Sequence, residues 1–154
     1  MKKEEIFFGK KIYLTALNKN NLSKNYKKWL RDKDISKFTE FRFNKLRDKN
    51  INVFLKKIIN SDNDYLFGIF DKKNNNHIGN IKIGNIDTNH KSAEIGFILG
   101  EKIYTNKGIM TEALKIATSI SFTKLKLKYV CGNVYEKNIA SIKVFKKNKY
   151  KLSG

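Results

Sequence analysis

Proline is absent from this chain of 154 residues, and cysteine and tryptophan occur once each. A single cysteine, Cys131, excludes an internal disulfide, and its apolar neighbours Tyr129 and Val130 predict a buried strand residue rather than a nucleophile. The two histidines, His77 and His90, have no cysteine or histidine partner at ligand spacing. The sequence therefore argues against a zinc site, and we expect no metal.

Long apolar runs are absent as well, and none approaches the roughly eighteen residues that a membrane-spanning helix requires. The first residues, Met1 to Glu5, continue into polar sequence without the apolar core of a secretory signal. No stretch rich in proline, glycine or serine marks a linker. We therefore expect one domain over residues 1–154, located in the cytoplasm and without a membrane partner.

Negative charge is scarce, since 33 basic residues face 14 acidic ones and the net charge is +19. Such an excess points to nucleic acid, an anionic surface or acidic metabolites. All but three of the basic residues are lysines, whereas nucleic-acid binders concentrate arginine and aromatic side chains on one element. This composition disfavours a nucleic-acid partner relative to an acidic metabolite. An even spread of lysine over a solvated surface explains the same excess.

The spacing of apolar residues predicts a mixed α/β layer rather than a barrel or a helical bundle. The three central strands are separated by polar turn sequences, which favours an antiparallel meander. The expected strands span residues 11–15, 65–70, 77–86, 91–99 and 128–134. The expected helices span residues 22–30, 46–60, 109–120 and 138–147.

A polar turn with one glycine runs directly into a helical pattern between Tyr104 and Leu114. A helix start exposes unpaired backbone N–H groups and the positive end of the peptide dipoles, which suits a phosphate. We interpret this turn as a cradle for a phosphate-bearing ligand. A simple loop-to-helix junction, in which Gly108 serves geometry alone, is the alternative.

With this order of elements, the chain resembles the GNAT superfamily of acyl-CoA-dependent N-acyltransferases over Ile12 to Tyr150. It is most similar to the branch with the Rim-type ribosomal-protein acetyltransferases and many amino-sugar acetyltransferases. The family's loop pattern, Gln/Arg-x-x-Gly-x-Gly/Ala, falls on residues 105–110, where Gly108 matches while Thr105 and Met110 depart. The longer run Gly-Ile-x-Thr-Glu-Ala at 108–113 matches too.

The resemblance implies a largely antiparallel central sheet flanked by helices, with strands that splay apart at the acyl-CoA site. It implies acetyl-CoA as cosubstrate. The residues whose backbone amides would hold its pyrophosphate are Asn106, Lys107, Gly108, Ile109, Met110 and Thr111. The residues that would pair with its pantetheine arm are Ile98, Leu99 and Gly100. Asn106 replaces a frequent glycine, and asparagine is the substitute best able to adopt a left-handed backbone.

Glu94 lies in an otherwise apolar strand, Ser92 to Phe97, at the position that supplies the general base in histone-acetyltransferase relatives. A base is needed because an ammonium group must lose a proton before its nitrogen can attack a thioester. The alternative is that Glu94 points into solvent or pairs with a lysine. Both interpretations stay open.

The run from Asn138 to Tyr150 resembles the family's second signature, Asn-x-x-Ser/Ala-x-x-x-Tyr-x-x-x-Gly-Phe. The match assigns Asn138 and Ser141 to the CoA arm, although Asn138 also suits a plain helix N-cap. Phe145 stands where many relatives have the tyrosine that protonates the departing thiolate. Either Tyr135 or Tyr104 replaces it, or CoA leaves as a thiolate, since a thiol has a reference pKa of about 8.5.

Two further departures lie near the C-terminus. Lys149 replaces the family's glycine, which predicts a helix end without the usual left-handed glycine cap. Relatives continue with one or two strands after the position of Gly154, so we expect the last family strands to be missing. A homodimer could cover the open edge.

Two classes of acceptor amine suit these residues. A nucleotide-linked amino sugar of surface-glycan biosynthesis suits the positive charge, and Phe41 and Arg42 are candidate contacts for its rings and its diphosphate. A protein N-terminal amine, as in the Rim-type enzymes, is the alternative. A non-catalytic acyl-CoA-binding domain is a further alternative, for which Phe145 is the best argument.

Overall fold

The computed structural model describes residues 4–36 and 48–154, and in these residues six strands form one sheet in the order β1-β2-β3-β4-β5-β6. Neighbouring strands are antiparallel except for β5 and β6, which are parallel. This arrangement confirms the expected mixed α/β class with a largely antiparallel sheet. The strands are β1 (Ile6–Phe8), β2 (Ile12–Ala16), β3 (Tyr65–Asp71), β4 (His77–Asp87), β5 (Ser92–Leu99) and β6 (Tyr129–Cys131).

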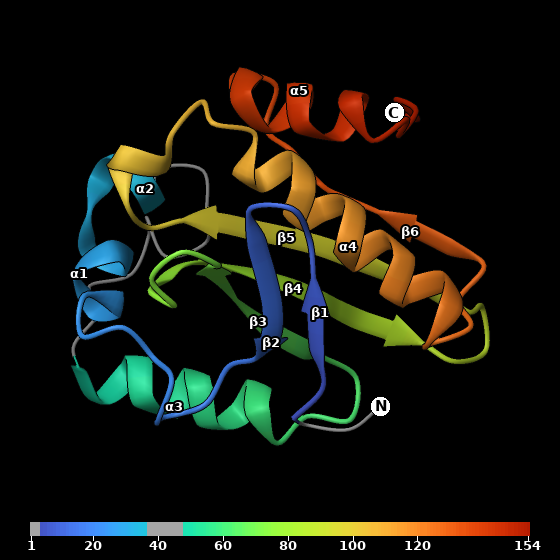
Figure 1. Cartoon of the computed structure of the whole chain (residues 1–154). Helices are drawn as coiled ribbons and strands as arrows, with labels where there is room; N and C mark the ends of the chain where they lie inside the picture. The colour runs from blue at the N-terminus through green and yellow to red at the C-terminus, as the bar shows by residue number, and fades with distance from the viewer. Residues whose placement is uncertain (1–3, 37–47) are drawn as a thin grey trace.

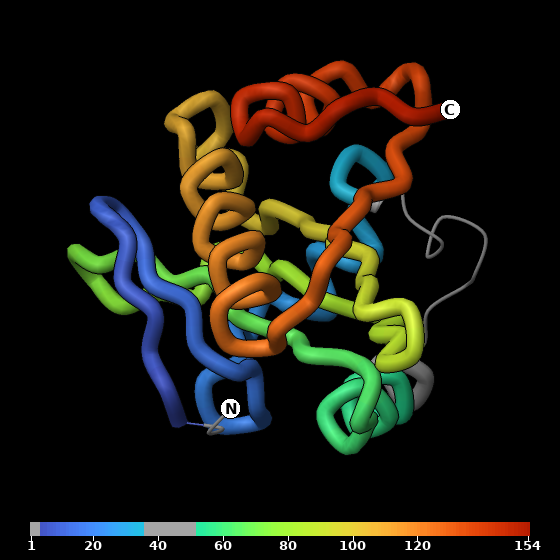
Figure 2. The backbone as a smooth tube through the Cα atoms, turned by 90° about the vertical axis from the view of Figure 1, so that its right-hand side faces the viewer, coloured from blue at the N-terminus to red at the C-terminus, as the bar shows by residue number. Residues whose placement is uncertain are grey.

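Helices cover both faces of the sheet. The described helices are α1 (Tyr26–Arg31), α2 (Lys33–Ser36), α3 (Asp48–Ile59), α4 (Ile109–Thr123) and α5 (Ile139–Lys147). Figure 1 shows α4 crossing the sheet in front, α3 below it and α5 above it, and Figure 2 shows the same arrangement from the side. A short 3₁₀ turn, Lys102–Tyr104, joins β5 to the loop before α4.

Two apolar clusters, one on each face, hold the sheet between its helices. The larger cluster joins Ile12, Ile69 and Ile81 of the sheet to Leu114 of α4, and each of these side chains is fully buried. The smaller cluster joins Trp29 of α1 and Leu55 of α3 to the sheet. Strand alternation produces this division, because successive side chains point to opposite faces. The candidate site lies at the edge of β5, where residues from both faces line one cavity.

The structure differs from the sequence-based expectation at three elements. The hairpin partner β1 was not expected, because three residues are too few to show strand alternation. Helix α1 begins at Tyr26 rather than at residue 22, because the backbone N–H of Ser23 donates to Nδ1 of His77 at 2.9 Å. Strand β6 has three residues rather than seven, because its partner β5 diverges from it after Glu94.

The expectation that Cys131 is buried is wrong. Its side chain is exposed, because β6 pairs with β5 on one side only and its exposed, half-buried, exposed pattern turns Cys131 outward. The apolar run around Cys131 misled the prediction, since Tyr129 in the same strand is itself 69% exposed.

The divergence of β5 from β6 opens the sheet. Pairing begins at Ser92 with Tyr129 and ends at Glu94 with Cys131, so in the part of the chain described the remainder of β5 pairs with β4 on one edge and has no strand on the edge that faces β6. Phe145 of α5 fills the resulting wedge, with its ring centroid 5.4 Å from that of Phe97. Gly132 permits this approach, because a Cβ atom there would lie 2.1 Å from the Phe145 ring. The splayed strands expected from the resemblance are present.

The end of α5 has no glycine cap, as expected, yet it keeps the left-handed geometry. Lys149 itself adopts the left-handed conformation with φ of 65°. The backbone N–H of Tyr150 donates to the carbonyl of Phe145, and that of Lys149 donates to the carbonyl of Lys146. This is the Schellman arrangement, formed without glycine because both hydrogen bonds and the Phe145–Tyr150 ring contact at 5.0 Å stabilise it.

Candidate active site

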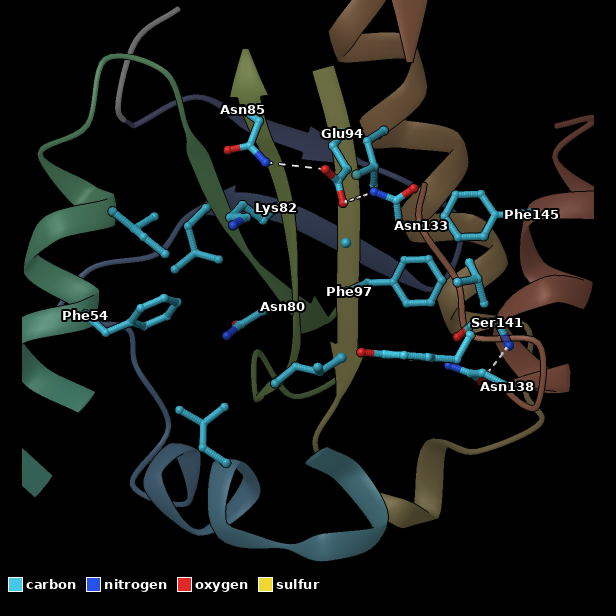
Figure 3. Close-up of a pocket in the computed structure, with 18 of the residues that line it drawn as sticks. Phe54, Asn80, Lys82, Asn85, Glu94, Phe97, Asn133, Asn138, Ser141 and Phe145 are labelled. Carbon is cyan, nitrogen blue, oxygen red and sulfur yellow. Dashed lines mark hydrogen bonds between the residues drawn. The ribbon is translucent and has the colours of Figure 1, made fainter. Parts of the chain in front are cut away.

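A cavity of about 670 Å³ lies at the point where β5 and β6 diverge. Figure 3 shows β4 and β5 running through its middle, α3 on one side and α5 on the other. Residues from both faces of the sheet line this cavity. Because β6 does not pair with β5 beyond Glu94, the cavity continues around the open edge of β5. Two ligands that approach from opposite faces could therefore meet there.

Glu94 lies at this junction and lines the cavity. The amide of Asn133 donates to Oε1 of Glu94 at 2.9 Å, and the amide of Asn85 donates to Oε2 at 3.3 Å (Figure 3). Glu94 is half-buried, and no ion pair joins it to a lysine of the described residues. A carboxylate with its orientation fixed in this way can accept a proton from a bound amine.

A buried polar network forms part of the cavity floor. Nδ1 of His77 accepts a hydrogen bond from the Ser23 backbone, so we assign the proton to Nε2, which lies 2.6 Å from Oδ1 of Asn80. Asn80 also bonds the phenol of Tyr26, whose pKa burial raises to about 12. Burial lowers the pKa of His77. The imidazole is therefore neutral, and it fixes the orientation of the Asn80 amide at the cavity.

Sequence reasoning missed Asn80, Lys82 and Asn133, although all three line the cavity. Lys82 gave a usable signal, because it alternates with the buried residues Ile81 and Ile83 and so belongs to the other face of the same strand. Asn80 and Asn133 gave none, since asparagine is common in this chain and their roles depend on contacts between segments distant in sequence.

The phosphate turn has the backbone geometry expected of it. Asn106 adopts φ of 61°, which confirms the expectation of a left-handed asparagine, and Gly108 at the N-cap of α4 adopts φ of 75°. Within the described chain, no acceptor bonds the backbone N–H of any residue from Asn106 to Thr111. Six successive unpaired amides beside the positive end of a 15-residue helix fit a pyrophosphate.

The hairpin between β1 and β2 fixes the position of this turn. Glu112, in the first turn of α4, accepts hydrogen bonds from the backbone N–H groups of Lys10 and Lys11. The Lys11 ammonium in turn donates to the carbonyl of Lys107 at 2.9 Å. Gly9 leaves room for the carboxylate, since a Cβ atom there would lie 2.6 Å from Oε1 of Glu112.

Asn138 caps α5, because its Oδ1 accepts a hydrogen bond from the backbone N–H of Ser141 at 3.2 Å (Figure 3). This is the structural alternative considered for Asn138. Both residues also line the cavity, so the cap does not remove them from the candidate CoA contacts. Phe145 lines the same wall beside Phe97 and carries no exchangeable proton.

The two tyrosines considered as acids occupy different places. Tyr135 lines the cavity and is 46% exposed. Tyr104 lies outside the lining, and its hydroxyl donates to Oδ2 of Asp71, which raises the pKa of Tyr104. The structure therefore favours Tyr135 over Tyr104 as a proton donor at this site.

Other predicted contacts are placed in part. Ile98 lines the cavity, whereas Leu99 and Gly100 continue the same strand edge outside the lining. Gly100 packs against Trp29, whose indole leaves no room for a side chain there. Phe41 and Arg42 lie outside the described residues. Over residues 4–36 and 48–154, no cluster of three or more potential metal ligands occurs, and no helix is long and apolar enough to cross a membrane.

Comparison with known proteins gives a family match over nearly the whole chain. The acetyltransferase (GNAT) domain family matches residues 11–151. A probable N-acetyltransferase of Bacillus subtilis, YjcK, is 34% identical over 64 residues, which are 42% of this chain. The matched stretch spans 35% of the length of that relative.

Solved structures share the fold at low sequence identity. Spermidine N-acetyltransferase from Vibrio cholerae, in complex with CoA and spermine, has a TM-score of 0.81 at 20% identity, over 94% of this chain and 83% of that one. RimL, a ribosomal L7/L12 alpha-N-protein acetyltransferase in complex with CoA, has a TM-score of 0.84 at 16% identity, over 97% and 86%. At these identities the likeness concerns the fold alone.

Proposed function

This chain belongs to the GNAT family of acetyltransferases, and we propose that it transfers the acetyl group of acetyl-CoA to a primary amine by direct attack in a ternary complex. The observation that carries the proposal is the position of Glu94, held by two asparagines where the cavity passes around the open edge of β5. The thioester of acetyl-CoA supplies the activated acetyl group.

The residues around the open edge fit this cosubstrate. The amides from Asn106 to Thr111 would bind its pyrophosphate, and the edge of β5 near Ile98 would hydrogen-bond its amide-containing arm as an added strand does. Asn138 and Ser141 would contact the same arm from α5. Spermidine N-acetyltransferase and RimL, which share this fold, were both solved in complex with CoA.

Glu94 would accept the proton of the bound ammonium, directly or through water, and so generate the nucleophilic amine. Phe145 cannot protonate the departing sulfur. We propose that CoA leaves as a thiolate, in keeping with a thiol reference pKa of about 8.5, and that Tyr135 is the alternative donor at the cavity. Because the carboxylate is present and oriented, we favour an enzyme over a non-catalytic acyl-CoA-binding domain.

For the acceptor, we propose a nucleotide-linked amino sugar, and the reaction then belongs to the cytoplasm. The net charge of +19 supports an anionic acceptor over a cationic protein N-terminus. The alternative, a protein N-terminal amine, takes its support from the fold shared with RimL.

A competition assay separates the two acceptor classes. A UDP-linked amino sugar and a short peptide with a free N-terminus are offered together with acetyl-CoA, and the acetylated products are measured by mass spectrometry. We expect the sugar nucleotide to be acetylated in preference. Preferential acetylation of the peptide would show that the sugar assignment is wrong.

A further inference from the structure

One cation and one carboxylate are the only charged side chains that line the cavity in the part of the chain described, and they are Lys82 and Glu94. A site for a polyamine would need several carboxylates to neutralise its ammonium groups. Here a second positive charge in the acceptor would meet Lys82. The charges therefore favour an acceptor that carries one positive and one negative group.

The strand register places these two side chains on one face of the sheet. Lys82 of β4 pairs with Gly96 of β5, and Gly84 pairs with Glu94. Lys82 and Glu94 are therefore diagonal neighbours, roughly 7–8 Å apart at their backbones. Figure 3 shows them on adjacent strands, with Glu94 turned toward Asn85 and Asn133. That separation matches two groups of one small molecule.

Gly96 leaves the space between them open. A Cβ atom at Gly96 would meet no atom within 4 Å, in contrast to Gly79, Gly84 and Gly100, where neighbouring atoms would lie at 2.7 Å or less. The glycine at position 96 is thus not required by packing inside the described protein. It preserves a hollow beside Lys82 that a ligand can occupy.

Lys82 is half-buried and makes no hydrogen bond or ion pair with the described residues. Its stem runs over Gly84, close to Asp64. Asp64 already accepts hydrogen bonds from the Asn85 backbone at 3.1 Å and from the Ser61 hydroxyl at 2.8 Å, and it forms no ion pair with the Lys82 ammonium. A partly desolvated ammonium without a partner favours binding of an anion.

We propose that the acceptor carries a phosphate or a carboxylate, which binds Lys82 while its amine lies at Glu94. Leu30, Ile58 and Leu66 form the apolar wall beside this pair and would contact the body of the molecule. Lys82 is then a specificity-determining residue of the acceptor site. This inference rests on the proposed acetyl transfer to an amine.

Matched acceptor pairs test the role of the anion. Phosphoethanolamine is compared with ethanolamine, and phenylalanine with phenylalaninamide, so that each pair tests one anion, a phosphate or a carboxylate. The ratio of kcat/KM for the member that has the phosphate or carboxylate and the member that lacks it is measured from thiol release with saturating acetyl-CoA. We expect at least one anionic member to be favoured by about tenfold or more, as for a charge-assisted hydrogen bond.

Three variants assign that preference to Lys82. Lys82→Met should abolish the preference by lowering kcat/KM much more for the acceptor that has the anionic group than for the one that lacks it. Lys82→Arg should retain most of it. Lys115→Met removes one exposed lysine of α4 outside the cavity, and it should behave as the wild type if the effect is local rather than due to net charge.

Equal loss for both members of a pair in Lys82→Met would overturn the proposal, and so would a wild-type enzyme that prefers the members without the anionic group. The absence of transfer to all four acceptors would also overturn it. In that case binding of acetyl-CoA, followed by thermal shift, separates the two claims: a rise in Tm leaves acetyl transfer to another amine standing, whereas no rise contradicts the proposed function itself.

Discussion

At the scale of single residues, the chemistry depends on how Glu94 is held. Its two oxygens each accept a hydrogen bond from an asparagine amide, one on β4 and one on the segment that follows β6. The Asn133 contact spans the separation between β5 and the segment after β6, and the Asn85 contact ties the carboxylate to β4. The carboxylate is thereby fixed at a place where residues from both faces of the sheet line the same cavity.

Glu94→Gln should lower kcat by roughly 10²- to 10⁴-fold, the usual contribution of a general base. The defect should shrink as pH rises, because more of the acceptor amine is then already deprotonated in solution. The measurement is a pH–rate profile with saturating acetyl-CoA.

The matched control for this prediction is Glu136→Gln, which removes the same charge from an exposed position outside the cavity lining. It should leave the profile unchanged. A Glu94→Gln enzyme with the wild-type rate and profile would show that Glu94 is not the base.

At the scale of elements, the open edge of β5 and the amide-rich start of α4 lie on either side of a short connection. The connection runs from Gly100 through the turn Lys102–Tyr104 to the left-handed Asn106 and Gly108. The β1–β2 hairpin braces it through Glu112 and Lys11. The short connection therefore fixes the edge of β5 and the start of α4 relative to each other, so that one extended ligand can contact both.

Helix α5 forms the opposite wall, and its end offers a stability prediction. Lys149 holds a left-handed conformation that costs a non-glycine residue about 1–2 kcal/mol. Lys149→Gly should therefore raise the free energy of unfolding by about 1 kcal/mol, since the greater freedom of glycine in the unfolded chain offsets part of the gain. Urea denaturation measures the change.

The control is Lys143→Gly in the same helix, where lysine already has helical geometry. That change should lower stability by about 1 kcal/mol, because glycine is a poor helix former. If both variants were destabilised alike, the left-handed cap would not be a source of strain.

The elements with strong apolar patterns were predictable from sequence, whereas the contacts between distant elements were not. Strands β3, β4 and β5 and helices α3, α4 and α5 have the expected type and place. Strand β1 was missed because its signal is three residues long, and the start of α1 was misplaced because His77, far along the chain, captures Ser23.

In the candidate site too, only residues that a local sequence pattern marks were predictable. Glu94 and Asn106 were found because each interrupts a local pattern, a strand in one case and a glycine motif in the other. Asn133 was missed because its contact with Glu94 joins residues 39 positions apart. Lys82 escaped notice among the 33 basic residues, although it alternates with the buried Ile81 and Ile83, and the hollow at Gly96 distinguishes it further from a surface lysine.

At the scale of the whole molecule, both sheet faces carry a core, and the smaller one contains a titratable group. His77 is packed among Tyr26, Trp29 and Phe70, with ring centroids at 6.2, 5.0 and 5.3 Å. Burial lowers the pKa of its imidazole, and the hydrogen bond with Asn80 is the largest of the effects that act in the opposite direction. The folded state therefore binds this proton less readily than the unfolded state does.

The lowered pKa of His77 makes the stability of the protein depend on pH. Below the unfolded pKa of about 6.5, the unfolded state binds more protons than the folded state. The contribution of His77 to stability is therefore fully present above that pH and is lost as pH decreases. Wild-type Tm should drop between about pH 7.5 and pH 5.5, and His77→Gln should show a smaller drop over the same interval. Parallel curves for the two proteins would contradict a neutral buried His77.

The central claim is that this chain moves an acetyl group from acetyl-CoA to an amine. The most direct test incubates the protein with acetyl-CoA labelled in its acetyl group and a mixture of sugar-nucleotide, amino-acid and peptide amines, followed by mass spectrometry. We predict a labelled N-acetyl product that accumulates one for one with free CoA, and far more slowly with Glu94→Gln. Free CoA without any acetylated amine, or no consumption of acetyl-CoA, would contradict the claim.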